Sequence, residues 1–198
     1  MKDLFVALVI VVIIIFTANY SYQIWRRHII PTLSTWITFV VGTGLSFSTY
    51  VIAANWDIRS GINNTADFAE VLIILVATLC WGKHEMRLRP FEKWYLSGVA
   101  AIVFYGFVSG NAWNSNILTQ VLITIGYIPT MHNLIQQKKN TESFFPWSCA
   151  LIASTLSLYP ALSEGNKLAV IYSTRAVVSL ILLLALMAYY QFFPKKSN

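Results

Sequence analysis

The chain has 198 residues, of which 57% are hydrophobic and only 11% are charged, whereas a soluble domain carries roughly 25% charged residues. This composition excludes an ordinary water-soluble fold. The formal net charge of +6 would suit a nucleic-acid-binding domain if the basic residues formed one patch. They stand instead in short clusters between long apolar runs, so the lipid bilayer is the expected partner and no nucleic acid is expected.

Seven apolar runs can cross a bilayer, since a spanning helix needs about 20 mostly apolar residues. In chain order the expected spans are residues 4–23, 35–54, 67–82, 94–109, 117–134, 144–162 and 168–193. The first run continues past residue 16 to about Gln23 without a small-residue cleavage site, so a span is expected there and not a signal peptide. In the third span, Asp67 and Glu70 leave a fully apolar core of only residues 71–81.

The basic residues separate by side in this seven-span scheme. Ten of them fall on one side, namely Arg26, Arg27, Lys83, Arg87, Arg89, Lys93, Lys138, Lys139, Lys195 and Lys196. Three fall on the other, namely Lys2, Arg59 and Lys167, and Arg175 lies inside a span. Because Lys and Arg in short loops mark the cytoplasmic side, the sequence predicts an integral, multi-pass membrane protein. Its amino terminus is expected outside and its carboxyl terminus in the cytoplasm.

An internal repeat appears at an offset of 111 residues. It aligns Ile24 with Ile135, Trp36 with Trp147, Leu45 with Leu156 and Ser46 with Ser157, and it places Arg27 and His28 on Lys138 and Lys139. The aligned units are spans one to three and five to seven, which have the same orientation because one unit and the connecting span make four crossings. We therefore predict an all-α membrane protein of two parallel three-helix bundles joined by a linker helix. The expected boundaries are residues 1–82, 83–112 and 113–198.

The most specific stretch of the sequence is IPTMHNLIQQKKNTESFFPWSCALIASTLSLYP, residues 128–160. A proline near the end of one helix is followed by a basic turn, and S-x-x-P-W begins the next helix. With the repeat, this stretch resembles the SWEET and PQ-loop superfamily, whose members are two parallel three-helix bundles joined by a linker helix. The resemblance implies a small-solute transporter, with sugars as the best-known cargo, and it implies a hinge or gating role for Pro129 and Pro160.

Three ionisable side chains fall within the expected spans, where each costs about 2.5–3.5 kcal/mol on insertion scales, so each is a candidate for solute binding. Asp67 and Glu70 are three residues apart and share a helix face. A rise of 1.5 Å per residue puts Glu70 about 9 Å and Arg175 about 10 Å below the outer surface. The resemblance implies that these two residues line a central pocket. The alternative is a structural pair, with Asp67 favoured simply by its place in the first helical turn.

Uncharged residues form a second group of candidates for solute binding. They are Asn19 and Gln23 on the first span, Ser46 on the second, Asn55 and Trp56 after it, Asn133 on the fifth and Ser157 on the sixth. Together they suggest a polar path, although small hydroxyl residues in membrane helices usually mediate close packing. Six tryptophans fall near predicted helix ends, as an aromatic belt at the membrane surface requires, namely Trp25, Trp36, Trp56, Trp94, Trp113 and Trp147.

The expected function is transport of a small polar solute by alternating access, either as a uniporter or with proton coupling. A sugar-like cargo leads, and the acidic pair also permits a cationic or amino-acid solute. The alternatives are a receptor or cargo-binding protein on the same fold, as in KDEL receptors, and a PnuC-type vitamin carrier, whose orientation is expected to be reversed. No combination of nucleophile, base and orienting group recurs at a plausible spacing, so we expect neither an enzyme nor a cofactor nor a metal site. Assembly into a homo-oligomer is left open.

Overall fold

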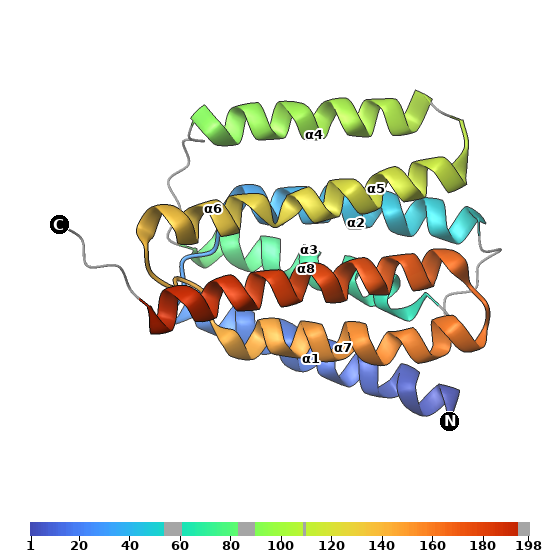
Figure 1. The fold of residues 1–198 in the computed structure, drawn as a ribbon, viewed down its shortest axis with the longest axis horizontal. Helices are drawn as coiled ribbons and strands as arrows, with labels where there is room; N and C mark the ends of the chain where they lie inside the picture. Colours follow the sequence, from blue (N-terminus) through green and yellow to red (C-terminus); the bar gives the residue numbers. More distant parts are fainter. Residues whose placement is uncertain (54–60, 83–89, 109, 194–198) are drawn as a thin grey trace.

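The computed structural model describes residues 1–53, 61–82, 90–108 and 110–193. These residues form α-helices and contain no strand. The helices are α1 (Lys2–Trp25), α2 (Leu33–Ala53), α3 (Ile62–Trp81), α4 (Pro90–Val108), α5 (Ala112–Gly126), α6 (Ile128–Gln137), α7 (Phe144–Ser163) and α8 (Lys167–Phe192). Because α6 continues α5 through Tyr127 as one bent rod (Figure 1), the described chain makes seven rods.

Helices lie at all seven expected spans, and five of them are long and apolar enough to cross a membrane, namely α1, α2, α3, α7 and α8. Three helices begin four or five residues earlier than expected, namely α3, α4 and α5, and the expected fifth span is divided. α3 begins at Ile62 and not near residue 67, because neighbouring helices satisfy its polar first turn: Asn64 Nδ2 donates to Ser46 Oγ at 3.1 Å. The expected fifth span divides at Tyr127, because Pro129 has no N–H for a continuous helix and fits the first turn of a new one.

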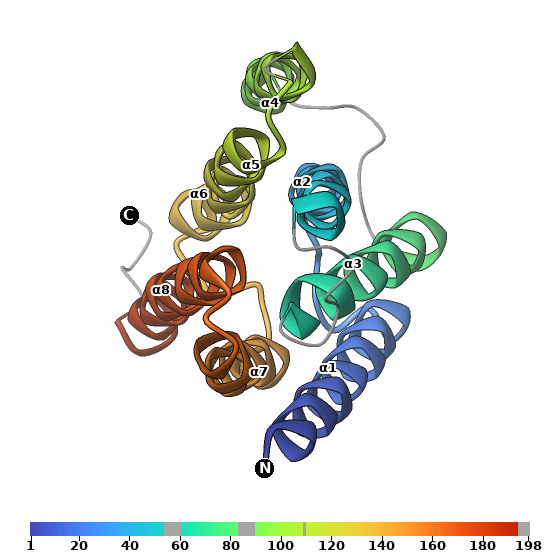
Figure 2. The same ribbon diagram turned by 90° about the vertical axis from the view of Figure 1, so that its right-hand side faces the viewer.

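Six of the rods form a closed ring, which Figure 2 shows end-on. α1 packs between α3 and α7, α2 packs between α3 and α5, and α8 packs between α5 and α7. α3 and α8 also contact each other across the middle, while α4 lies outside the ring against α5 and α2. Successive rods run in alternating directions (Figure 1), so α1 begins at one end of the ring and α8 finishes at the other.

The two ends of the ring differ in charge. The end at which α1 and α6 finish carries five of the described basic residues, Arg26, Arg27, Lys93, Lys138 and Lys139, and is called the basic end. The opposite, amino-terminal end carries Lys2, which forms an ion pair with Glu164, and Lys167. The other basic residues outside the spans lie beyond the described ranges, namely Arg59, Lys83, Arg87, Arg89, Lys195 and Lys196.

Asparagine side chains begin α5 and α8 at the amino-terminal end. Asn111 Oδ1 accepts hydrogen bonds from Trp113 N at 2.9 Å and from Asn114 N at 3.2 Å. Asn166 Oδ1 accepts from Ala169 N at 3.2 Å, which satisfies a free N–H of the first turn. Asn166 Nδ2 also donates to Tyr50 Oη at 2.8 Å, so the start of α8 is tied to the end of α2.

The turns that follow α1 and α6 share an uncommon backbone conformation. Arg27 has φ 58° and Lys138 has φ 51°, and no other described residue with a side chain has a positive φ. The two positions are 111 residues apart, which is the offset of the sequence repeat. The repeat therefore extends to a local backbone feature that its few sequence identities do not reveal.

We predict that Arg27→Gly and Lys138→Gly each raise the free energy of unfolding by about 0.5–1 kcal/mol, because glycine adopts the left-handed conformation without steric cost. The measurement is thermal unfolding of the detergent-solubilised protein. Arg26→Gly is the matched control, since Arg26 has φ −73° and glycine there should destabilise. Destabilisation by all three substitutions would contradict the left-handed turns.

Candidate functional site

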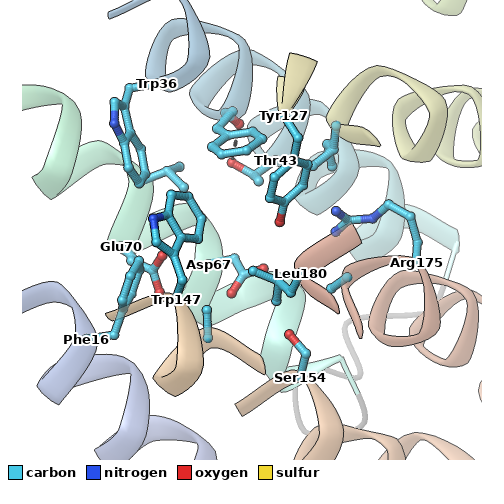
Figure 3. A pocket seen from close by; sticks show the side chains of 15 residues that line it. Phe16, Trp36, Thr43, Asp67, Glu70, Tyr127, Trp147, Ser154, Arg175 and Leu180 are labelled. Carbon is cyan, nitrogen blue, oxygen red and sulfur yellow. Dashed lines mark hydrogen bonds between the residues drawn. The ribbon is translucent and has the colours of Figure 1, made fainter. Parts of the chain in front are cut away.

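A cavity lies in the middle of the ring, and all six rods of the ring contribute to its wall (Figure 3). Its charged residues are Asp67 and Glu70 from α3 and Arg175 from α8. The cavity has a volume of about 40 Å³, which is room for water but not for a sugar or an amino acid. A solute of that size therefore requires the ring to open.

The two acidic residues reach the cavity from successive turns of α3, as their spacing predicts. Asp67 Oδ2 accepts a hydrogen bond from Tyr172 Oη at 2.9 Å. Glu70 is only 7% exposed, and within the described ranges it makes no hydrogen bond or ion pair. Burial of a carboxylate without a partner is costly, so Glu70 is the acceptor that a solute or a proton can satisfy.

Arg175 faces the acidic residues from α8. Its guanidinium lies over the ring of Tyr172, with Cζ 4.7 Å from the ring centroid, which is a cation–π contact. Its Nε and Nη1 are buried and have no hydrogen-bond partner, and the hydroxyl of Tyr127 points toward the guanidinium (Figure 3). In the described part of the chain no ion pair joins Arg175 to Asp67 or Glu70. The cavity thus holds a hydrogen-bond donor and an acceptor that do not satisfy each other.

Glu70 and Arg175 lie at matching depths. α3 begins at Ile62 and α8 begins at Lys167. Each of the two charged residues is therefore eight positions along its helix, or about 12 Å from the amino-terminal end of the ring. The structure brings the two residues to one cavity at one level, and it does not pair them.

Aromatic side chains close the cavity toward the basic end. Trp36 and Trp147 stack with ring centroids 6.0 Å apart and an interplanar angle of 19°. Tyr20 packs against both indoles, at 5.1 Å from Trp36 and 5.9 Å from Trp147. Phe16 and Tyr127 each lie 6.1 Å from Trp147. We call this cluster the aromatic floor: Phe16, Tyr20, Trp36, Phe39, Tyr127 and Trp147.

The aromatic floor corrects one prediction from the sequence. Trp36 and Trp147 are only 2% and 3% exposed, so the assignment of these two residues to an aromatic belt at the membrane surface is wrong. Trp25 and Trp94 are exposed, at 55% and 82%, as a belt requires. A position near a helix end does not determine on which face of the helix a side chain lies. Trp36 and Trp147 lie on the faces that point into the ring.

The wall of the cavity uses equivalent positions of the two halves of the chain. The lining pairs separated by 111 residues are Phe16 and Tyr127, Trp36 and Trp147, Phe39 and Ala150, and Thr43 and Ser154. The charged residues break this symmetry, because the same offset relates Asp67 to Val178, Glu70 to Ile181 and Arg175 to Asn64. The cavity wall therefore combines four pairs at this offset with a single set of charges.

Ser46 and Ser157 do not line the cavity but mediate helix packing beside it. Ser46 Oγ accepts hydrogen bonds from Asn64 Nδ2 at 3.1 Å and from Gln120 Nε2 at 3.0 Å. Ser157 Oγ forms a hydrogen bond with Ser173 Oγ at 2.8 Å. These contacts tie α2 to α3 and α5, and they tie α7 to α8, as small hydroxyl residues in membrane helices commonly do.

The remaining polar candidates lie away from the cavity wall. Gln23 Nε2 donates to Asn19 Oδ1 on α1, and Gln137 Nε2 donates to Asn133 Oδ1 on α6 at 2.8 Å. Each bond joins residues one helical turn apart near the basic end. Asn55 and Trp56 lie outside the described residues.

The two candidate hinge prolines are both buried, at opposite ends of the ring. Pro129 begins α6 near the basic end, and Pro160 lies inside α7 near the amino-terminal end. Proline removes a helical N–H donor, so each rod has a place at which it can bend.

Glu142 is a buried acidic residue that the sequence does not single out. It lies in the loop between α6 and α7 at the basic end and is 6% exposed. Its Oε2 accepts hydrogen bonds from Tyr20 Oη at 2.8 Å and from Trp147 Nε1 at 3.2 Å. Burial raises the pKa of Glu142 to about 7, while the hydrogen bonds from Tyr20 and Trp147 lower it. The one signal in the sequence is a carboxylate that follows two lysines in a short turn.

No family model, no curated protein and no solved structure matches this chain. The functional proposal therefore stands on the cavity and the aromatic floor.

Proposed function

We propose that this protein is a membrane transporter for a small polar solute that binds between α3 and α8. The observation that carries the proposal is the pair of unsatisfied groups on the cavity wall: the buried carboxylate of Glu70 and the Nε and Nη1 atoms of Arg175. Ionisable side chains that face the interior of a membrane bundle mark solute or ion pathways. A site enclosed in the middle of the helices can be reached from both sides only if it is exposed to each in turn.

The proposed architecture is two parallel three-helix units, α1 to α3 and α5 to α8, joined by α4. The contacts between helices support it, because they keep the same pattern when α1, α2 and α3 are exchanged with α5, α7 and α8, respectively. α1 packs on α7 as α5 packs on α2, α1 packs on α3 as α5 packs on α8, and α2 packs on α3 as α7 packs on α8. The left-handed turns at Arg27 and Lys138 and the stacked Trp36 and Trp147 add equivalent positions. Transporters built from such repeats rock one unit against the other around a central site.

The proposed orientation places the basic end in the cytoplasm and the amino terminus outside. With α4 and the bent rod of α5 and α6 counted as spans, the chain crosses the bilayer seven times. Of the described basic residues outside the spans, five lie at the basic end and two at the amino-terminal end. This bias is the one that marks the cytoplasmic side of membrane proteins.

A small zwitterion of the amino-acid type satisfies the cavity best. Its carboxylate meets the free donors of Arg175, its ammonium meets Glu70, and the aromatic floor accommodates an apolar portion. Buried charges that meet a counter-charge with good hydrogen-bond geometry lose much of their desolvation penalty. A sugar can offer hydroxyl groups to the same atoms but leaves both charges uncompensated, so it is the second choice.

We predict that the purified protein in liposomes takes up a zwitterionic amino acid in a screen that also contains sugars and nucleosides. Arg175→Gln and Glu70→Gln should each weaken apparent affinity roughly 10- to 150-fold, since a hydrogen bond to a charged group contributes about 1.5–3 kcal/mol. The measurement is the KM of uptake. Lys167→Gln is the matched control, because Lys167 begins the same helix as Arg175 and is exposed.

Two results would contradict the proposed function. Uptake that is unaffected by both substitutions would remove the cavity from the transport path. Absence of uptake for every solute, together with tight binding of a peptide, would indicate a receptor on this fold.

The orientation generates a separate prediction, for a variant in which Cys80 and Cys149 are replaced by alanine. A membrane-impermeant maleimide added to intact cells should label Ser163→Cys, at the amino-terminal end, and should label Lys139→Cys, at the basic end, only after permeabilisation. Both native residues are exposed, so access within the protein does not limit the reaction. Equal labelling of the two sites in intact cells would contradict the orientation.

A further inference from the structure

Glu142 connects the aromatic floor to the loop between α6 and α7. One carboxylate oxygen, Oε2, accepts a hydrogen bond from Tyr20 on α1 and another from Trp147 on α7, at 2.8 and 3.2 Å. The backbone N–H of Glu142 donates to Asn140 Oδ1 at 3.1 Å, which holds the loop around the carboxylate. A single buried side chain thus links α1 of the first unit to the loop and α7 of the second.

The helices that Glu142 links form one of the contacts between the two proposed units, so rocking of one unit against the other would separate them at the basic end. α1 and α7 are neighbours in the ring, and Tyr20 packs edge-on against Trp147, with an interplanar angle of 75°. Moving α1 away from α7 would break the hydrogen bond from Tyr20 and admit water to the carboxylate. Glu142 is only 6% exposed in this structure, in which the ring is closed at the basic end. We call this arrangement the closed floor, and the burial of Glu142 depends on it.

We propose that Glu142 is a proton-binding site that releases its proton when α1 and α7 separate at the basic end. This inference rests on the opening of the ring in the proposed function, but the contacts of the solute with Arg175 and Glu70 play no part in it.

The direction of the coupling follows from burial. In the closed floor burial raises the pKa of Glu142 to about 7, whereas a hydrated glutamate has a pKa of about 4.3. At a pH between these two pKa values, Glu142 is protonated in the closed form and deprotonated in the open form. Acid therefore favours the closed floor. The ratio of open to closed molecules rises up to about tenfold per pH unit from about pH 5 and levels off above about pH 7.

The groups that face Glu142 do not titrate in this range. Tyr20 presents a phenol from α1 and Trp147 presents an indole from α7, and neither group is an acid that ionises near neutrality. Lys138 and Lys139 precede Glu142 in the loop and are exposed. The chain also carries two other ionisable residues near the basic end, His28 and His132. The pH response must therefore be shown to depend on Glu142 itself.

The test is a pair of spin labels at Arg26→Cys and Phe145→Cys, which are exposed positions at the adjoining ends of α1 and α7. The protein carries alanine at Cys80 and Cys149 and is reconstituted in lipid nanodiscs. Pulsed electron resonance measures the distance between the labels from pH 5 to pH 8. We expect the longer-distance population to grow with pH and to reach a plateau above about pH 7.

Two variants assign the response to Glu142. Glu142→Gln retains an acceptor oxygen but has no proton to release, so the short distance should predominate at every pH. Tyr20→Phe removes a hydrogen bond that favours the charged carboxylate, so the transition should move to higher pH. Glu164→Gln is the matched control, because Glu164 is an exposed carboxylate at the opposite end of the ring, and its curve should coincide with the parent curve.

Three outcomes would overturn the inference: distances that do not change with pH, a closed population that grows with pH, or a Glu142→Gln variant that keeps the parent response. If Glu142→Gln does not fold, an unshifted transition in Tyr20→Phe overturns it equally. None of these outcomes alters the expected uptake results for Arg175 and Glu70, so the two proposals fail separately.

Discussion

Charged side chains lose their hydration when they enter a hydrocarbon layer, and this cost of several kcal/mol determines where the charges of the protein lie. In the described ranges, every Lys and Arg except Arg175 lies at one of the two ends of the ring. Asp67, Glu70 and Arg175 line the cavity in the middle of the ring, and Glu70 also borders a groove between α1 and α3. The outer faces of the same helices carry apolar side chains such as Ile14 and Ile73, which are 61% and 53% exposed. The ring therefore keeps a few charges in an otherwise apolar interior and has an apolar outer surface.

The positions of the helices could be predicted from the sequence because the length of an apolar run is a local property. The cavity charges could be predicted as well, because ionisable residues within apolar runs are rare and costly. The early start of α3 could not, since its polar first turn is stabilised by Ser46 on another helix. Glu142 was missed for the same reason, because its partner Tyr20 is 122 residues away in the sequence.

The offset of 111 residues relates several uncharged residues of the cavity wall to one another, but it relates none of the charged residues of the wall to another charge. Four pairs of residues on the cavity wall lie 111 residues apart, whereas none of its charged residues has a charged counterpart at that offset. Acidic groups lie on the side of α3 and the guanidinium lies on the side of α8. A dipolar solute would therefore bind in one orientation, although the surrounding helices are nearly equivalent.

The prolines described above have a consequence for which half of the molecule deforms. The helices α1, α2 and α3 contain no proline in their described residues, whereas the rods of the other half carry Pro129 at one end and Pro160 at the other. A helix with a missing N–H bond bends at lower energetic cost than an uninterrupted one. In the proposed transport cycle, the first half would therefore behave as a stationary frame, and the second half would flex at two points on opposite sides of the cavity.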